Sequence, residues 1–191
     1  MTRREFLCNT FVLAAGICLI PSLNVRASAY GVQVRETNLS FRSLENRLAT
    51  DAIVIHHIGN TDRDVSAAEV HEWHLANGWS GIGYHYLIRK NGMIERGRPR
   101  DTVGAHCLGH NSNTIGINIV GNFEFARPNE AQLDSAARLT AALCQLYRIR
   151  PSESTIVGHR DFNNTSCPGE NMYEMIPSLR RNTAYILERG L

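Results

Sequence analysis

The sequence predicts an α/β fold: a single domain with a central mixed sheet of mainly five to six strands, flanked by about three helices. Short runs of β-branched apolar residues, typical of buried strands, alternate with longer segments that have helical spacing. A chain of 191 residues is long enough for one domain with a proper core and too short for two domains. Because strands and helices interleave from residue 51 onwards, one sheet covered by helices is the simplest architecture.

The first strand and the first helix have clear boundaries in the sequence. Residues 51–60, DAIVIHHIGN, form an apolar run that ends in turn residues, which predicts a buried strand. Residues 64–78, DVSAAEVHEWHLANG, predict a helix that is capped by Ser66, with Glu69 three residues later. Gly78 is expected to end this helix.

The rest of the domain continues the alternation. The expected elements are a hairpin within 82–97 joined at Asn91-Gly92, a short strand and loop at 102–113, a buried strand at 114–123, a helix from Asn129 to 147, a last strand at 154–159 and a C-terminal helix that Pro177 breaks or restarts. No internal repeat and no low-complexity segment interrupts this order.

The N-terminus has the three regions of an export signal. Arg3 and Arg4 precede the apolar run FVLAAGICLI, and Ala27-Ser28-Ala29 is a small-x-small cleavage site. We therefore expect a signal peptide at 1–29. The stretch TRREFL resembles the twin-arginine signal, which carries folded proteins, whereas an ordinary secretory signal is the alternative. The apolar run is shorter than the about 20 residues of a membrane span, so no stable span is expected after cleavage.

Cleavage would leave an exported chain, periplasmic or extracellular, with an N-terminal arm at 30–50 and a functional domain at 51–191. The signal peptide holds three arginines against one glutamate, so its removal brings the formal net charge from +2 to zero. A nucleic-acid-binding protein normally carries a basic excess, so this class of partner is not expected.

Three cysteines remain after cleavage, which is an odd number for an exported protein. At least one of Cys107, Cys144 and Cys167 therefore has no internal disulfide partner. Cys144 lies in an apolar helical pattern, as a core residue would. Cys167 lies instead in the polar loop GHRDFNNTSCPG, at 158–169, where little apolar material surrounds it.

Candidate metal ligands follow two of the predicted strands. His56 and His57 end the first strand, and His159 and Cys167 flank the loop after the last one. Strand ends are where α/β proteins build sites, and two imidazoles with one thiolate are typical of a catalytic zinc that keeps an open position. Successive strand residues face opposite sides, so only one of the paired histidines can take part. From the residues alone, two interpretations are equally open: a metal site, or histidines whose hydrogen-bond partners are purely structural.

Four motifs in order, DAIVIHHIGN, EWHLANGWSGIGYHYLIRKNGMIERGR, GAHCLGHNSNTIGINIVGNF and VGHRDFNNTSCPG, resemble the N-acetylmuramoyl-L-alanine amidase type 2 family. This family includes the phage lysozyme-type amidases and the peptidoglycan recognition proteins. The resemblance runs from about Asp51 to the C-terminal helix. It implies a zinc-dependent hydrolase that cleaves the amide between N-acetylmuramic acid and L-alanine of the stem peptide. Its partners would be peptidoglycan or muropeptides, and we expect a monomer.

The resemblance also implies roles for individual residues. The zinc ligands would be His56, His159 and Cys167. Tyr84 would be the catalytic tyrosine beside the metal, and Thr165 would assist the developing oxyanion. The alternative for Tyr84 is a core aromatic residue on a strand.

Further residues match the family's substrate groove. His106 would line the groove and Asn113 would help to shape it, although a structural role is an equal alternative for each. Some branches of the family carry a glutamate, proposed as a base, where this chain has Asn118. A neutral amide cannot take a proton, so this chain is expected to rely on Tyr84 and the metal. Asp161 is a candidate to orient a histidine ligand.

Two histidine patterns are expected to lie outside the site. HEWH, from His71 to His74, is one residue short of the zincin motif, and its histidines are expected to decorate a helix. His85 should face away from the metal if its neighbour Tyr84 faces it. The alternative function is a non-catalytic recognition module on the same fold. In that branch the cysteine is typically replaced, so Cys167 favours catalysis.

Overall fold

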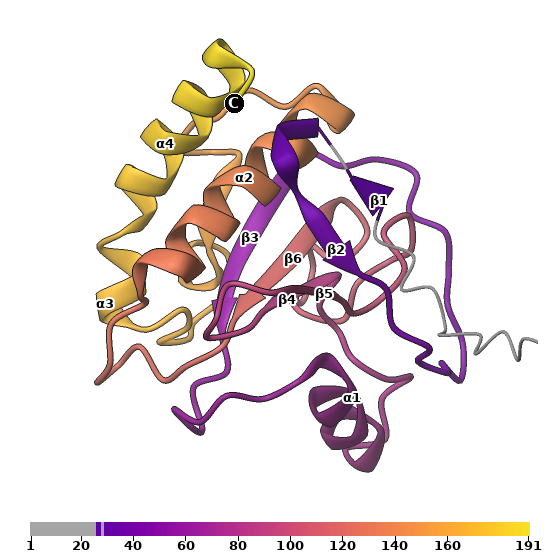
Figure 1. The fold of residues 1–191 in the computed structure, drawn as a ribbon. Helices are drawn as coiled ribbons and strands as arrows, with labels where there is room; N and C mark the ends of the chain where they lie inside the picture. The colour runs from indigo at the N-terminus through magenta and orange to yellow at the C-terminus, as the bar shows by residue number, and fades with distance from the viewer. Residues whose placement is uncertain (1–25, 28) are drawn as a thin grey trace, which may run out of the picture.

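The computed structural model describes residues 26–27 and 29–191 (Figure 1). Most of the expected signal peptide, residues 1–25 and 28, lies outside the described residues. Within the described part of the chain, no helix has the length and apolar character that a membrane crossing requires.

A mixed sheet forms the centre of the molecule, in the strand order β1-β2-β5-β4-β6-β3-β7. The strands are β1 (Arg26–Ala27), β2 (Gln33–Arg35), β3 (Ala52–His57), β4 (Tyr86–Ile88), β5 (Ile94–Arg96), β6 (Thr114–Ile119) and β7 (Ile156–Gly158). The β1–β2 and β4–β5 pairs are antiparallel and the other neighbours are parallel. The predicted fold class is confirmed, with one two-residue edge strand, β1, beyond the expected five to six.

Helices cover both faces of the sheet. They are α1 (Ala67–Ala76), α2 (Glu130–Tyr147), the short α3 (Glu170–Tyr173) and α4 (Ile176–Arg189), with single 3₁₀ turns η1 (Ala29–Gly31) and η2 (His159–Asp161). In Figure 1, α2 and α4 lie side by side over one face. Helix α1 covers the other face, where Val70 packs with Leu87 of β4 in a second, smaller core.

The two cores fix the direction of each side chain in β3. Ile53 and Ile55 are fully buried in the larger core under α2 and α4. Because side chains alternate along a strand, His56 points away from this core while His57 points back towards it. His57 accepts a hydrogen bond at Nδ1 from the Phe123 amide, 3.1 Å away.

Local sequence signals explain where the long helices begin. Ser66 caps α1 by accepting the Glu69 amide at 3.2 Å, as predicted. Asn129 caps α2, and its side chain and that of Gln132 form a reciprocal capping box. Pro177 lies in the first turn of α4, where a missing amide hydrogen costs nothing, so it restarts the helix after α3.

Three segments differ from the sequence prediction. The arm at 30–50 contributes β2, which pairs with β5, although its pattern is too short to reveal a strand. The segment 102–113 is a loop that holds only a single β-bridge, from Thr102 to Asn46. The hairpin loop is longer than Asn91-Gly92 alone, and Gly92 supplies its one left-handed residue, at φ 83°.

Candidate metal centre

The site lies where parallel strands end at a common edge of the sheet. Strands β3 and β7 are neighbours, and Ile55 pairs with Gly158. The next residue along β3 is His56, and the next residue after β7 is His159, which opens η2. The register of two strands therefore carries two imidazoles to the same place.

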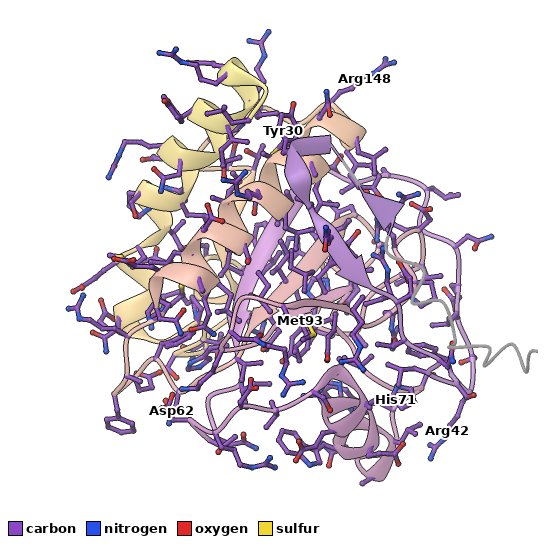
Figure 2. All side chains as sticks on the ribbon, viewed as in Figure 1. Tyr30, Arg42, Asp62, His71, Met93 and Arg148 are labelled. Carbon is purple, nitrogen blue, oxygen red and sulfur yellow. The ribbon has the colours of Figure 1, made fainter. Side chains whose placement is uncertain are left out.

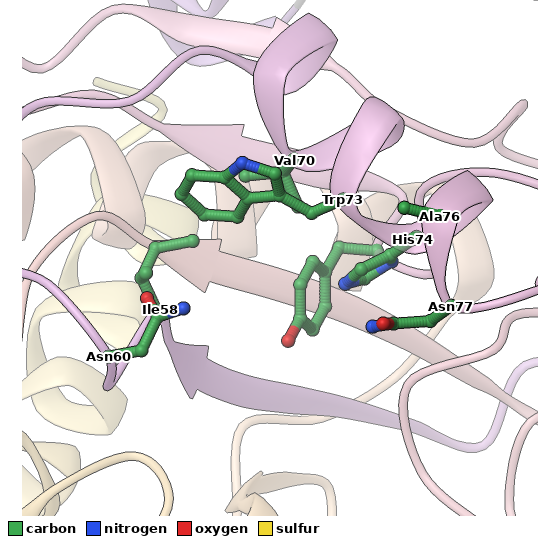
Figure 3. Close-up of a pocket in the computed structure, with 8 residues that line it drawn as sticks. Ile58, Asn60, Val70, Trp73, His74, Ala76 and Asn77 are labelled. Carbon is green, nitrogen blue, oxygen red and sulfur yellow. The ribbon is translucent and has the colours of Figure 1, made fainter.

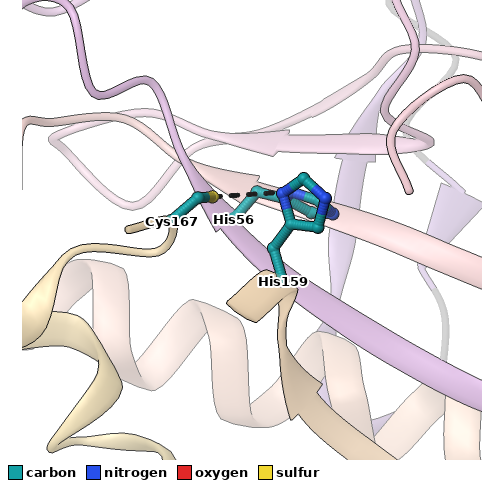
Figure 4. Close-up of side chains that lie close together, drawn as sticks. All are labelled: His56, His159 and Cys167. Atoms are coloured by element: carbon teal, nitrogen blue, oxygen red, sulfur yellow. Dashed lines mark hydrogen bonds between the residues drawn. The ribbon is translucent and has the colours of Figure 1, made fainter. Parts of the chain in front are cut away.

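The loop after η2 brings the sulfur to these imidazoles. One donor atom from each of His56, His159 and Cys167 lies within 4.8 Å of the others (Figure 4). The sulfur of Cys167 is 3.6 Å from Nδ1 of His56, and the two imidazole rings are 4.5 Å apart between centroids. The structure thus brings together the three residues that the sequence identified as ligands.

Burial sets the charge state of these donors. It lowers the pKa of His56 well below the ordinary value, with His106 and His159 adding to the effect, and it also lowers the pKa of His159. Burial raises the pKa of the Cys167 thiol to about 12. Both imidazoles therefore keep a lone pair at neutral pH, and a cation would have to displace the thiol proton. Two neutral imidazoles and one sulfur suit zinc and suit calcium or magnesium poorly.

His106 stands behind His56. Its Nδ1 lies 3.0 Å from Nε2 of His56, and its side chain is buried. The glycine at 116 makes room for this ring, because a Cβ there would lie 2.6 Å from Cγ of His106. His106 thus contacts a cluster histidine directly, and its role in lining a substrate groove stays a prediction.

Asn163 takes the position beside His159 that Asp161 was expected to take. Its Oδ1 lies 3.0 Å from Nε2 of His159. The carboxylate of Asp161 instead accepts hydrogen bonds from the Gly158 amide, at 2.8 Å, and from the hydroxyl of Tyr173. Sequence reasoning missed Asn163, although its place four residues after a histidine in a turn-rich loop brings the two side chains within reach.

Tyr84 borders the cluster on the side of α1. Its ring centroid is 5.1 Å from that of His56. It lines a cavity of about 360 Å³ together with Trp73, His74 and Asn77 of the α1 region (Figure 3). Burial raises the pKa of Tyr84, and the nearby Cys167 raises it further, so the phenol stays protonated at neutral pH. Tyr84 is therefore a hydrogen-bond donor at the border between cluster and cavity.

The other residues singled out by the sequence lie in different places. Thr165 is in the Cys167 loop, where its hydroxyl accepts the Cys167 amide at 3.2 Å. Asn113 is not brought to the cluster: its amide donates to Asp51 at 2.9 Å, at the start of β3. Five residues of strand, about 16 Å, separate that point from the level of His56.

The buried Asn118 pairs with His56 across the β3–β6 register. Within the described part of the chain, neither polar atom of its side chain has a hydrogen-bond partner. A buried, unpaired amide is costly. The side chain lies close enough to the Tyr84 hydroxyl to lower the pKa of that group, against the larger effect of burial.

Three further histidines have structural partners. His71, on α1 (Figure 2), accepts the Ile82 amide at Nδ1, and His74 accepts the Gly83 amide at 3.0 Å. His85 accepts the Gly116 amide and contacts the Thr102 carbonyl. None of the three belongs to the donor cluster among the described residues, as predicted.

Fold and site together define an α/β protein with a His–His–Cys cluster at the edge of a mixed sheet, next to an open cavity. The chain belongs to the N-acetylmuramoyl-L-alanine amidase family, whose sequence profile matches residues 46–170. The resemblance seen in the sequence is thus confirmed.

Known endolysins and peptidoglycan recognition proteins both resemble this chain. The endolysin of Klebsiella phage KP32 is 32% identical over 125 residues, which cover 64% of this chain and 82% of the endolysin. The endolysin N-acetylmuramoyl-L-alanine amidase of Clostridium intestinale has 35% identity and a TM-score of 0.69, over 76% of this chain and 93% of that one. A mutant of the Drosophila recognition protein PGRP-LB, solved in complex with tracheal cytotoxin, has 26% identity and a TM-score of 0.69, over 76% and 93%. These relatives place the chain among proteins related to peptidoglycan.

Proposed function

We propose that this chain is a zinc-dependent N-acetylmuramoyl-L-alanine amidase. Its substrate would be the amide that joins the lactyl group of N-acetylmuramic acid to L-alanine of the stem peptide. The observation that carries the proposal is the convergence of His56, His159 and Cys167 within 4.8 Å, in a chain of the amidase family. The signal peptide expected at 1–29 would deliver the enzyme outside the cytoplasm.

The donor set suits zinc and leaves room for a reaction. His56 and His159 would bind it through nitrogen and Cys167 through sulfur, and three protein ligands leave one position open. When bound, zinc supplies Lewis acidity, which polarises a carbonyl and acidifies water. The half-buried positions of His159 and Cys167 let a substrate approach from the side of the loop.

Tyr84 would stabilise the charge that develops on the carbonyl oxygen. Burial raises its pKa, so it donates a hydrogen bond and does not act as a base. The Thr165 hydroxyl accepts the Cys167 amide, which leaves its own hydrogen free to donate. Removal of one donor of this kind typically slows turnover on the order of 10²- to 10³-fold.

The second candidate function is a non-catalytic recognition module, and the likeness to peptidoglycan recognition proteins favours it. The sulfur of Cys167 speaks for catalysis, because binding of a glycan or peptide requires no thiol beside two imidazoles. The Tyr84 ring beside His56 and the Thr165 hydroxyl next to the Cys167 backbone support the same choice.

Digestion of purified peptidoglycan by the zinc-loaded protein tests the proposal. We expect free stem peptides with L-alanine at their N-terminus, and glycan strands of unchanged length. Binding of peptidoglycan and zinc without peptide release would leave the recognition module as the function. Shortened glycan strands would contradict the proposed bond. Zinc content by mass spectrometry completes the test.

A further inference from the structure

The side chain of Asn163 links two loops beside the donor cluster. Its Oδ1 lies 3.0 Å from Nε2 of His159 and 3.2 Å from the sulfur of Cys107. Its Nδ2 lies 3.1 Å from the Leu108 carbonyl. Its backbone amide donates to the His159 carbonyl at 3.1 Å, which closes a turn between the two residues.

These partners fix which way the Asn163 amide points. A backbone carbonyl can only accept, so the NH₂ group must face Leu108. The oxygen must then face His159 and Cys107, and both of these groups must donate to it. His159 therefore carries its hydrogen on Nε2 and keeps the lone pair on Nδ1, the nitrogen left for a metal.

His159 needs such a partner more than His56 does. His56 lies in the middle of the sheet and is only 1% exposed, so packing holds its ring. His159 lies in the 3₁₀ turn η2 and is only half-buried, so packing holds its ring less firmly. Asn163 meets this need without adding a negative charge beside the Cys167 sulfur.

We propose that Asn163 is a positioning residue, which holds His159 in the Nε2–H tautomer and aims its Nδ1 at the metal, while the Cys107 thiol keeps the amide oriented. The inference rests on the proposed function, because zinc is the ion that the cluster would hold. It gives the loop that holds Asn163 a role beyond the three ligands, through the contact of its Oδ1 with Nε2 of His159.

The experiment compares Asn163→Ala, Asn163→Asp and the matched control Asn164→Ala. Asn164 is the exposed neighbour of Asn163, and its side chain has no hydrogen-bond partner within the described residues. Zinc affinity is measured by competition with a chromophoric chelator. The His159 tautomer is measured from the ¹⁵N shifts of its imidazole in the metal-free and the zinc-loaded protein.

Loss of the acceptor in Asn163→Ala should weaken zinc binding about 10- to 100-fold and mix the two tautomers in the metal-free protein. Asn163→Asp keeps an acceptor and should retain the Nε2–H signature and most of the affinity. Asn164→Ala should match the wild type. Wild-type affinity and an unchanged tautomer in Asn163→Ala would overturn the inference.

The design separates this inference from the proposed function. Failure of the wild-type protein to bind zinc would contradict the proposed function, and the tautomer of the metal-free wild type would still decide the positioning role. An Nδ1–H tautomer of His159 in that sample would overturn the inference by itself.

Discussion

Nε2 of His56 lies 3.0 Å from Nδ1 of His106, so the donor cluster continues into a second layer of imidazole. If His56 presents Nδ1 to a metal, its Nε2 hydrogen is free to donate to His106. Asn163 stands in the same relation to His159, at the same distance of 3.0 Å. Each imidazole of the cluster thus has one nitrogen towards the sulfur side and one held by a neighbour.

Gly116→Ala should disturb this second layer. The added methyl would lie 2.6 Å from Cγ of the buried His106 ring, which has no space to retreat. We expect weaker zinc binding and a loss of about 1–3 kcal/mol in the free energy of unfolding. Chelator competition and urea unfolding measure the two effects.

A double-mutant cycle provides the control for this substitution. In a His106→Ala background the clash is gone, so Gly116→Ala should cost little more. Equal losses in both backgrounds would mean that the methyl acts on the β6 backbone and not through His106.

Tyr84→Phe should separate catalysis from metal binding. The ring would remain beside His56, at a centroid distance of 5.1 Å in the wild type, and only the hydroxyl would be lost. We expect unchanged zinc content and a turnover about 10²- to 10³-fold lower. Tyr185→Phe, at an exposed position on α4, is the matched control. Full activity of Tyr84→Phe would remove the hydroxyl from the mechanism.

Zinc should stabilise the folded protein, because all three donors meet only in that state. At a free zinc concentration about 1,000 times the Kd, the gain in unfolding free energy would be about 4 kcal/mol. Thermal unfolding with zinc and with excess chelator measures it. Cys167→Ser should lose most of this gain, whereas Cys144→Ala, in the core on α2, should keep it. A zinc-dependent gain of wild-type size in Cys167→Ser would contradict the ligand assignment.

Acid should destabilise the fold partly through His85. Burial lowers the pKa of this histidine from 6.5 to about 3 in the folded protein. As the pH falls below 6.5, the unfolded chain binds a proton that the folded chain refuses. The unfolding free energy should therefore fall by up to about 1.4 kcal/mol per pH unit from this group, and the loss ends only near its folded pKa.

His85→Gln tests this contribution. The amide can still accept from Gly116 and donate to the Thr102 carbonyl, but it does not titrate. Urea unfolding of the metal-free proteins should give a shallower pH dependence in the variant below neutral pH. Parallel curves for the two proteins would show that His85 takes up its proton equally in both states.

The alternation of strands and helices could be predicted from the sequence, because buried β-branched runs and helical spacing are local patterns. The caps Ser66 and Asn129 were likewise readable, since each lies next to the helix that it starts. The short β2 could not be predicted, because a three-residue strand depends on pairing with β5 and not on its own sequence pattern.

The same limit applies to the site. Its three donors could be named because residue type, strand ends and the family resemblance agree. The partners of the donors could not, because they depend on how loops pack. His106 and Asn163 come from loops, and their contacts have no periodic signal. Asn113 matches a groove segment in sequence, but the register of β6 puts it beside Asp51.

The donor cluster joins residues that lie far apart in the sequence, since His56 and Cys167 are 111 positions apart. A nascent chain that stops before residue 159 carries one donor of the three, and a full-length chain with β7 misplaced beside β3 separates the imidazoles. Tight chelation would therefore report that synthesis has passed Cys167 and that β3 and β7 lie side by side.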